Sequence, residues 1–193
     1  MKITINLIRH GVTEGNQKKW YYGDTDLPLT NEGIDQLVEF TQKGIYPSAD
    51  NMKLYTSGLT RAEQTFFLIY GPLEHKIIEG LREYKFGEFE QKSYEDLKDI
   101  PEYIKWIEDT ELDYEVPGGE SISQFDKRVN DTFAKLVGMG NSAIVVCHGG
   151  VISAIMQRLF PKQKEHIFAW IPSPGRGYAL DFEDGVPVEF REI

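Results

Sequence analysis

Two histidines in this sequence each follow an apolar run and precede a glycine. His10 comes after Arg9 at the end of the run 3–8, and His148 follows the run 143–147. One such arginine–histidine pair is most simply a packed histidine beside a surface arginine. Two histidines that end separate strands of one sheet are harder to explain by packing, and a permanently charged guanidinium favours an anionic ligand. The pattern therefore indicates an anion site.

Two further segments supply charged side chains after strand candidates. Arg61 lies in the first turn of a helix expected over 59–70, where a cation opposes the positive end of the helix dipole. That charge is tolerable if an anion lies between it and the helix end. The segment 81–90 contributes several carboxylates. A second helix start, after His148, also suits an anion.

The elements that must position these residues alternate between strand and helix. Strands are expected at 3–8, 52–56, 76–78 and 143–147. A hairpin is expected at 178–182 and 186–190, around the turn Asp184-Gly185. Helices are expected from Thr30 to Gly44 and at 59–70, 94–109 (broken at Pro101), 121–137 and 151–159. This order predicts an α/β three-layer domain with a mostly parallel sheet. Ligands of such sheets bind beyond the carboxyl ends of the strands, where both histidines are expected.

The composition limits the class of protein. The chain has 193 residues, enough for about one domain, and its 21 Lys+Arg against 31 Asp+Glu give a net charge of −10. An acidic chain argues against a nucleic-acid binder and against attachment to an anionic membrane surface. The lone Cys147 excludes an internal disulfide, and no run approaches the ~18 apolar residues of a membrane span. We therefore expect a cytoplasmic protein with no nucleic-acid or membrane partner.

Taken in order, the motifs resemble the histidine phosphatase superfamily, in its phosphoglycerate-mutase-like branch. The resemblance spans nearly the whole chain. It rests on Leu7-Ile8-Arg9-His10-Gly11 with Thr13 and Asn16, on Gly23, Asp26, Leu29-Thr30 and Gly33, on Thr56-Ser57, Leu59 and Arg61-Ala62, on Leu81, Glu83 and Phe86-Gly87, on Gly118-Gly119-Glu120-Ser121, and on Val146-Cys147-His148-Gly149-Gly150. An isolated Arg-His-Gly is a weak signal, but all these pieces in this order are specific.

The resemblance implies a fold and a cover. It implies one histidine phosphatase-like domain over residues 1–193, a three-layer αβα sandwich with a six-stranded, mainly parallel sheet and a phosphoglycerate mutase-like topology. Residues 84–120 would partly cover the active site. Gly58 stands where the family commonly has proline, and we expect it to loosen the turn ahead of Arg61.

The resemblance also implies a role for each site residue. His10 would become a phosphohistidine, and Glu83 would give a proton to the leaving group, ahead of its rivals Glu88 and Glu90. Phosphoryl oxygens would be bound by Arg9, Arg61 and His148, and the substrate site would be completed by Asn16, Thr13, Gly11 and Gly149. Guanidinium groups would offset the charge of a phosphate monoester and stabilise its transition state, so no metal or cofactor is expected.

The leading hypothesis is a metal-independent phosphatase of small phosphorylated metabolites. One alternative is a 2,3-bisphosphoglycerate-dependent phosphoglycerate mutase, which shares the first half-reaction. Mutases are expected to be longer between the second arginine and the second histidine, and a second phosphate would find few cations beyond Lys85, Lys92 or Arg176 here. Another alternative is an α-ribazole phosphate phosphatase, since compact members include such enzymes. A homodimer is compatible with the sequence.

Two other hypotheses and several residues are given less weight. A phospho-ligand binding protein without catalysis is disfavoured by the intact motifs, and a metallohydrolase is disfavoured because the arginines would repel a cation. The aromatic run 20–22 is expected to pack slightly in preference to binding substrate. Cys147 is expected in the core, His75 and His166 at structural or surface positions, and the acidic run 108–115 in a solvated loop.

Overall fold

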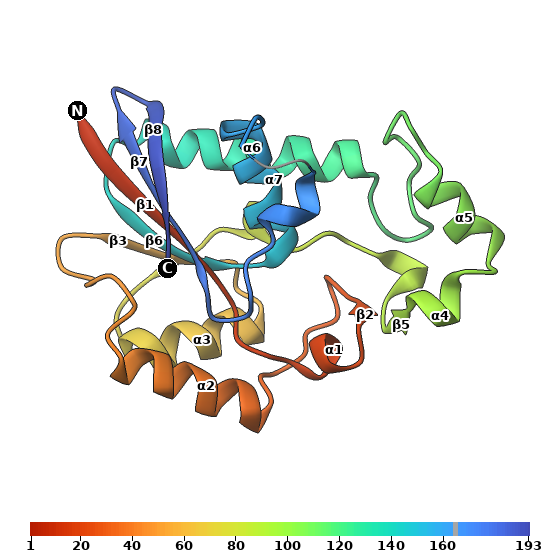
Figure 1. Ribbon diagram of the computed structural model, residues 1–193, viewed down its shortest axis with the longest axis horizontal. Coiled ribbons are helices and arrows are strands. Elements are labelled where there is room, and N and C mark those ends of the chain that lie inside the picture. The colour runs from red at the N-terminus through yellow and green to blue at the C-terminus, as the bar shows by residue number, and fades with distance from the viewer. Residues whose placement is uncertain (164–165) are drawn as a thin grey trace.

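A six-stranded sheet runs through the centre of the computed structural model, which describes residues 1–163 and 166–193 (Figure 1). The strand order is β4-β3-β6-β1-β7-β8. The strands are β1 (Lys2–Arg9), β3 (Lys53–Thr56), β4 (Lys76–Ile77), β6 (Ala143–Cys147), β7 (Gly177–Glu183) and β8 (Val186–Glu192). The first four in this order are parallel, and β7 is antiparallel to both β1 and β8. The predicted six-stranded, mainly parallel sheet is confirmed.

Two pairs of long helices cover the two faces of the sheet. In Figure 1, α2 (Asn31–Gln42) and α3 (Thr60–Tyr70) lie below it, and α6 (Ile122–Gly138) and α7 (Gly149–Leu159) lie above it. The short elements are α1 (Glu14–Gln17), α4 (Tyr94–Leu97), α5 (Pro101–Ile107), the strands β2 (Trp20–Tyr21) and β5 (Lys92–Ser93), and the 3₁₀ turns η1 (Glu79–Leu81), η2 (Gly87–Phe89) and η3 (Ile167–Trp170). The three-layer αβα arrangement expected from the sequence is therefore present.

The central strand β6 explains how the two layers of helices share one sheet. All five of its residues are buried, as expected for a parallel strand covered on both faces. Val145 packs into the core on one face, whereas Ile144 and Val146 pack on the other with Ala62 and Phe66 of α3. The period of two along the strand thus feeds both cores.

Local sequence signals set several element boundaries. Thr30 caps α2 by accepting the Gly33 N–H, and Ser121 opens α6 with a capping box. Pro101 is the first residue of α5, so the helical stretch is broken there as predicted. The turn between β7 and β8 has positive φ at both Asp184 and Gly185, as a type I′ hairpin requires.

The small sheet formed by β2 and β5 was not expected from the sequence. It joins residues 20–21 to 92–93 in antiparallel fashion, beside α4 and α5 (Figure 1). Its Tyr21 ring lies 5.3 Å from that of Phe86 and 5.8 Å from that of Trp106. For Tyr21 the structural interpretation of the aromatic run is therefore correct.

The turn before α3 corrects one expectation. Gly58 has a φ of +81°, and its N–H donates to the Thr56 hydroxyl at 3.2 Å. Proline is held near a φ of about −65° and has no N–H to donate. The glycine therefore does not loosen a proline-type turn; it makes a different, hydrogen-bonded turn.

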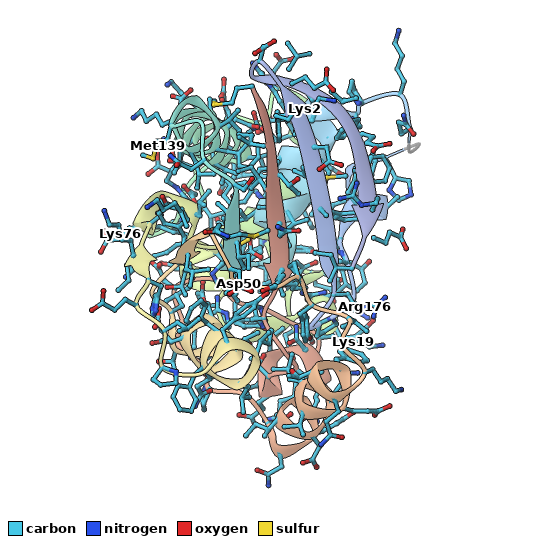
Figure 2. The ribbon with its side chains drawn as sticks, turned by 90° about the vertical axis from the view of Figure 1, so that its left-hand side faces the viewer. Lys2, Lys19, Asp50, Lys76, Met139 and Arg176 are labelled. Carbon is cyan, nitrogen blue, oxygen red and sulfur yellow. The ribbon has the colours of Figure 1, made fainter. Side chains whose placement is uncertain are left out.

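The sheet has one end at which the parallel strands stop. Figure 2 shows Lys2, where β1 begins, near one end of the molecule, and Arg176 and Lys19 toward the other.

Within residues 1–163 and 166–193, no helix is long and apolar enough to cross a membrane.

Candidate active site

The two strand-ending histidines lie side by side. Strands β1 and β6 are parallel neighbours with Arg9 opposite Cys147, so the next residue on each strand reaches the same edge. The ring centroids of His10 and His148 are 5.3 Å apart, and both side chains are buried. The juxtaposition predicted from the sequence is therefore present.

The ring of His10 is held in one tautomer. Its Nδ1 lies 2.7 Å from the carbonyl oxygen of Gly11. Because a carbonyl oxygen only accepts hydrogen bonds, Nδ1 carries the proton and the Nε2 lone pair is free. Burial, and then the charges of Arg61 and Arg9, hold the pKa of His10 well below its ordinary value. A neutral imidazole with an available lone pair is the nucleophilic form.

His148 is positioned by two elements. It is the N-cap residue of α7, and its Nε2 lies 2.8 Å from the hydroxyl oxygen of Ser57, which follows β3. Burial and then the charge of Arg61 hold the pKa of His148 well below its ordinary value. Ser57 was noted in the sequence only as part of a motif; nothing in its spacing alone predicts this contact.

Arg61 is fully buried although it lies in the first turn of α3. Its guanidinium donates to the carbonyl oxygens of Gly23 at 2.8 Å and Thr25 at 3.0 Å, and it lies 4.9 Å from the centroid of the Tyr22 ring. Two carbonyls and an aromatic face therefore offset part of the cost of placing a cation at this helix end. Burial lowers the pKa of Arg61, and neighbouring Tyr22 and Glu83 oppose that effect.

Arg9 is held by the segment that precedes β7. Its Nη1 donates to the carbonyl oxygen of Pro172 at 2.7 Å. Within the described ranges, Arg9 Nε, Arg61 Nε and His148 Nδ1 are buried without a hydrogen-bond partner. The two guanidinium Nε–H groups are buried donors, which are costly without acceptors, and an oxyanion supplies several acceptors. These arginine nitrogens, with His148 beside His10, fit a phosphate-like ligand.

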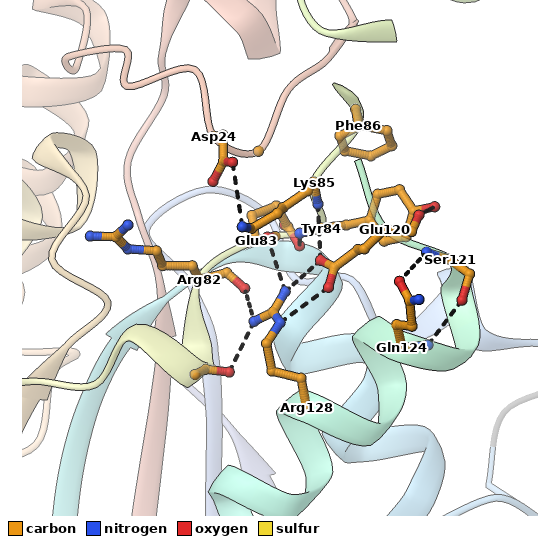
Figure 3. A network of polar contacts seen from close by, with 12 residues as sticks. Asp24, Arg82, Glu83, Tyr84, Lys85, Phe86, Glu120, Ser121, Gln124 and Arg128 are labelled. Atoms are coloured by element: carbon orange, nitrogen blue, oxygen red, sulfur yellow. Dashed lines mark hydrogen bonds and ion pairs between the residues drawn. The ribbon is translucent and has the colours of Figure 1, made fainter. Parts of the chain in front are cut away.

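Glu83 reaches the same site from the loop after η1. Its Oε2 accepts the N–H of Gly150 at 2.9 Å and its Oε1 accepts the N–H of Tyr84 at 3.0 Å. A Cβ atom at Gly150 would lie only 2.4 Å from Glu83 Oε1. The second glycine after His148 therefore makes room for the carboxyl at the start of α7. Figure 3 shows the contacts that hold the backbone around Glu83.

The other four predicted site residues, Thr13, Asn16, Gly11 and Gly149, have contacts within the protein that explain their residue types. Thr13 caps α1 in a capping box with Asn16, whose Oδ1 accepts the Thr13 N–H at 3.0 Å. At Gly11, a Cβ would lie 2.7 Å from Leu37 of α2. The glycine is thus required by helix packing. At Gly149 a Cβ would lie 3.2 Å from Arg9 Nε, so this glycine admits the guanidinium.

Tyr22 belongs to the site, although packing was given slightly more weight. Its hydroxyl is 2.7 Å from the Thr13 hydroxyl, and its ring centroid is 6.4 Å from that of His10. The aromatic run 20–22 gave no sign of which ring would turn toward His10. Strand pairing settles this, because Trp20 and Tyr21 enter β2 and Tyr22 follows it.

Glu90, considered as a rival to Glu83, has a structural task. Its carboxylate accepts the N–H groups of Gly23 at 2.8 Å, Asp24 at 3.1 Å and Thr25 at 3.1 Å. These residues form the loop whose carbonyls bind the Arg61 guanidinium. Glu90 thus fixes the loop 23–25, whose carbonyl oxygens bind the Arg61 guanidinium.

The remaining residues follow the structural interpretation. Cys147 is buried, and burial raises the pKa of its thiol far above the ordinary value. His75 pairs with Glu63 at 2.8 Å, and His166 is exposed. Across the part of the chain that is described, no group of three or more His, Cys, Asp and Glu residues has the arrangement of a metal site.

Known proteins share both the sequence pattern and the fold. A model described as the histidine phosphatase superfamily (branch 1) matches residues 5–190. The adenosylcobalamin/alpha-ribazole phosphatase of Escherichia coli (strain K12) is 31% identical over 182 residues, covering 91% of this chain and 88% of that protein. The alpha-ribazole phosphatase of Shigella flexneri has a crystal structure that matches with a TM-score of 0.80 at 27% identity, covering 96% of this chain and 94% of that one.

A mutase is similar over almost the same span. The 2,3-bisphosphoglycerate-dependent phosphoglycerate mutase of Parvibaculum lavamentivorans is 28% identical over 201 residues, covering 93% of this chain and 91% of that protein. The 201 aligned positions exceed the 193 residues of the whole chain, so this mutase has residues within the matched span that the chain lacks. A longer segment between the second arginine and the second histidine of mutases stays a prediction.

Proposed function

The chain belongs to branch 1 of the histidine phosphatase superfamily, and from this premise we propose that it hydrolyses phosphate monoesters of small metabolites through a phosphohistidine on His10. The observation that carries the proposal is the tautomer of His10. Its Nδ1–H is bound to the Gly11 carbonyl, so Nε2 is the nitrogen free to attack. Arg9, Arg61 and His148 surround it as partners for the phosphoryl oxygens.

In the first step, His10 Nε2 attacks the phosphorus atom of the monoester. The bond between phosphorus and the ester oxygen breaks, and the leaving alkoxide takes a proton from the carboxyl group of Glu83. The alkoxide thus leaves as a neutral alcohol, and Glu83 is left as a carboxylate. The arginines stabilise the charge on the equatorial oxygens. The Gly11 carbonyl accepts the Nδ1–H throughout, so it also stabilises the positive charge that develops on the ring.

In the second step, water replaces the alcohol. The Glu83 carboxylate takes a proton from the attacking water, a new P–O bond forms, and the N–P bond breaks. Inorganic phosphate and neutral His10 are released, and Glu83 again carries its proton. One water is consumed and the protein is unchanged.

The partners of three cations favour hydrolysis over a mutase reaction, in which a second phosphate group of the intermediate must also be bound. Lys85 Nζ lies 3.8 Å from a carboxylate oxygen of Asp24, and Lys92 Nζ donates to the Glu88 carbonyl at 2.6 Å. The Arg176 guanidinium lies 5.4 Å from the centroid of the Phe40 ring. A second phosphate would have to compete for groups that already have protein partners, whereas water needs none of them.

An α-ribazole phosphate is the first substrate to test. The relatives from Escherichia coli and Shigella flexneri carry that activity in their names, and the chain covers 88% of the first and 94% of the second. The phosphoglycerate mutase remains the second candidate, since its first half-reaction uses the same residues. A cytoplasmic location, a homodimer and a cover formed by residues 84–120 stay predictions.

The test is turnover of p-nitrophenyl phosphate after metal removal and in excess EDTA. We expect full activity in the wild type and none in His10→Ala, with the exposed His166→Ala as control. Activity that returns only with a divalent ion would contradict metal independence. A second assay mixes the protein with 3-phosphoglycerate and catalytic 2,3-bisphosphoglycerate. Isomerisation much faster than phosphate release would identify a mutase instead.

A further inference from the structure

Glu83 lies in a stretch without regular secondary structure. Residues 82–86 are neither helix nor strand, between η1 and η2. Ladder hydrogen bonds therefore do not fix the backbone that carries the proposed proton donor. A proton donor displaced by about 1 Å can lose much of its effect, so this backbone needs another constraint.

Arg128, on α6, contacts the backbone at three points, one in η1 and two in the stretch that carries Glu83 (Figure 3). Its Nη1 donates to the carbonyl oxygens of Gly80 and Arg82, each at 3.0 Å, and its Nη2 lies 3.4 Å from that of Glu83. A guanidinium presents its donors in a planar fork, which sets the directions of these bonds. The carbonyl groups of Arg82 and Glu83 flank the Glu83 α-carbon, and both are therefore bound to one planar group on the long helix α6.

Glu120 holds the guanidinium and the far end of the same stretch. Its two carboxylate oxygens accept from Arg128, at 2.6 Å from Nη2 and 3.2 Å from Nε. One of these oxygens also accepts the Lys85 N–H at 3.0 Å, and the Glu120 N–H donates to the Lys85 carbonyl at 3.1 Å. The Glu120 side chain is only 10% exposed and that of Arg128 25%. This partly buried pair is bidentate, so its geometry is well defined.

We propose that Arg128 and Glu120 are positioning residues for Glu83, fixing the backbone from 80 to 85 so that the carboxyl lies against the Gly150 N–H. The inference rests on the proposed function, in which Glu83 protonates the leaving group. Both residues act through Glu83 and through the backbone, and their contacts are with the protein.

The substitution Arg128→Lys separates geometry from charge. It keeps the positive charge that acts on His148 but removes the fork that binds the carbonyls and the carboxylate. The readout is kcat/KM for an alkyl substrate, β-glycerol phosphate, and for p-nitrophenyl phosphate. A nitrophenolate leaves without much help, so it depends little on a proton donor.

We expect Arg128→Lys to lower kcat/KM for β-glycerol phosphate by about tenfold or more and that for p-nitrophenyl phosphate by less than about threefold. In a Glu83→Gln background, Arg128→Lys should cause no further loss on β-glycerol phosphate, because the group it positions is gone. The control is Lys127→Gln, an exposed neighbour on α6 that pairs with Asp131, and it should leave both substrates unaffected.

Several outcomes would overturn the inference. Equal losses on the two substrates, or a full additional loss in the Glu83→Gln background, would show that Arg128 acts on something other than Glu83. If Arg128→Lys does not fold, Glu120→Gln is measured in the same way and must show the same selective loss. A wild-type protein inert on both substrates would defeat the proposed function and this inference with it, whereas an active wild type with unselective variants would defeat the inference alone.

Discussion

At the scale of single residues, the two buried histidines link stability to pH. His10 and His148 both have pKa values well below the ordinary 6.5, through burial first and then the charge of Arg61. Each therefore binds a proton less readily in the folded protein than in the unfolded chain. Below pH 6.5 the unfolded chain takes up more protons, so their contribution is complete above that pH and is lost as the pH falls.

This sign can be measured by urea unfolding between about pH 7.5 and about pH 5.5. We expect the free energy of unfolding of the wild type to fall by up to about 1.4 kcal/mol per pH unit for each histidine. The slope should be smaller in His148→Gln and unchanged in the exposed control His166→Gln. A His148→Gln slope as steep as that of the wild type would contradict a neutral His148 in the folded protein.

Gly150 offers a variant in which stability and activity should separate. Gly150 is the second residue of α7 and does not have a positive φ, so an added Cβ brings no backbone strain and Gly150→Ala should not lower the melting temperature through backbone effects. Its Cβ would, however, lie 2.4 Å from the present position of Glu83 Oε1 and displace the carboxyl. We expect a larger loss of kcat on β-glycerol phosphate than on p-nitrophenyl phosphate.

The matched control for this substitution is Gly138→Ala at the end of α6. A Cβ there meets no atom within 4 Å. It should leave both activities at the wild-type level. Equal activity of Gly150→Ala and wild type on β-glycerol phosphate would mean that the Glu83 carboxyl group does not need its present position against Gly150 to protonate the leaving group.

At the scale of elements, the carboxylate of Glu90, the residue that follows η2, fixes the loop 23–25 beside Arg61. Glu90 accepts N–H groups from residues 23–25, and the carbonyls of that loop bind Arg61. Glu90→Gln removes the negative charge and turns one of the two acceptor oxygens into an amide NH₂ that cannot accept these N–H groups. The hydrogen bonds that remain are weaker, because a charged acceptor binds more strongly than a neutral one. The Arg61 guanidinium should then be held less firmly.

We expect Glu90→Gln to weaken inhibition by inorganic phosphate by about tenfold, which corresponds to about 1.4 kcal/mol. The inhibition constant is measured beside that of Glu88→Gln, in which an exposed carboxylate on the same turn is neutralised. Phosphate that inhibits Glu90→Gln as strongly as wild type would show that Arg61 is placed without this loop.

The elements that the sequence predicted well carry strong local signals. Central β6 is a continuous apolar run, α6 has apolar residues at helical spacing after a serine cap, and the Asp184-Gly185 turn joins two strands. For these, local pattern and tertiary packing agree. The place of His10 beside His148 followed from the sheet, since parallel strands end at one edge.

The contacts that the sequence did not reveal depend on residues far apart in the chain. Ser57 meets His148 across 91 positions, and Glu90 meets Gly23 across 67. Such pairs leave no periodicity, and a serine or glutamate in a loop looks like any solvated residue. Tyr22 was ambiguous for the same reason, because only the pairing of β2 with β5 decides which ring of the aromatic run faces the site.

At the scale of the whole molecule, the net charge opposes the substrate. The protein carries a charge of −10, whereas the proposed substrate is a dianion drawn by the buried Arg61 and the half-buried Arg9. Salt screens charges separated by more than about 10 Å at 0.1 M, and it screens buried groups much less. Added salt should therefore weaken long-range repulsion more than local attraction.

We expect kcat/KM for p-nitrophenyl phosphate to rise as the ionic strength increases from about 10 mM to about 100 mM. The measurement uses a salt whose anion does not itself inhibit at these concentrations. A steep fall over this range would mean that exposed cations at the mouth, and not Arg9 and Arg61, dominate the approach of substrate.

The position of β1 has a consequence for how the protein is made. This strand comes long before its partners β6 and β7 in the chain, with Ile5 opposite both Ala143 and Leu180. Contacts between such distant residues form slowly and late. Until β6 has been synthesised, the apolar strand that precedes His10 has no sheet edge to join, so nascent chains should need protection from aggregation and should acquire activity only after β6 and β7 have been made.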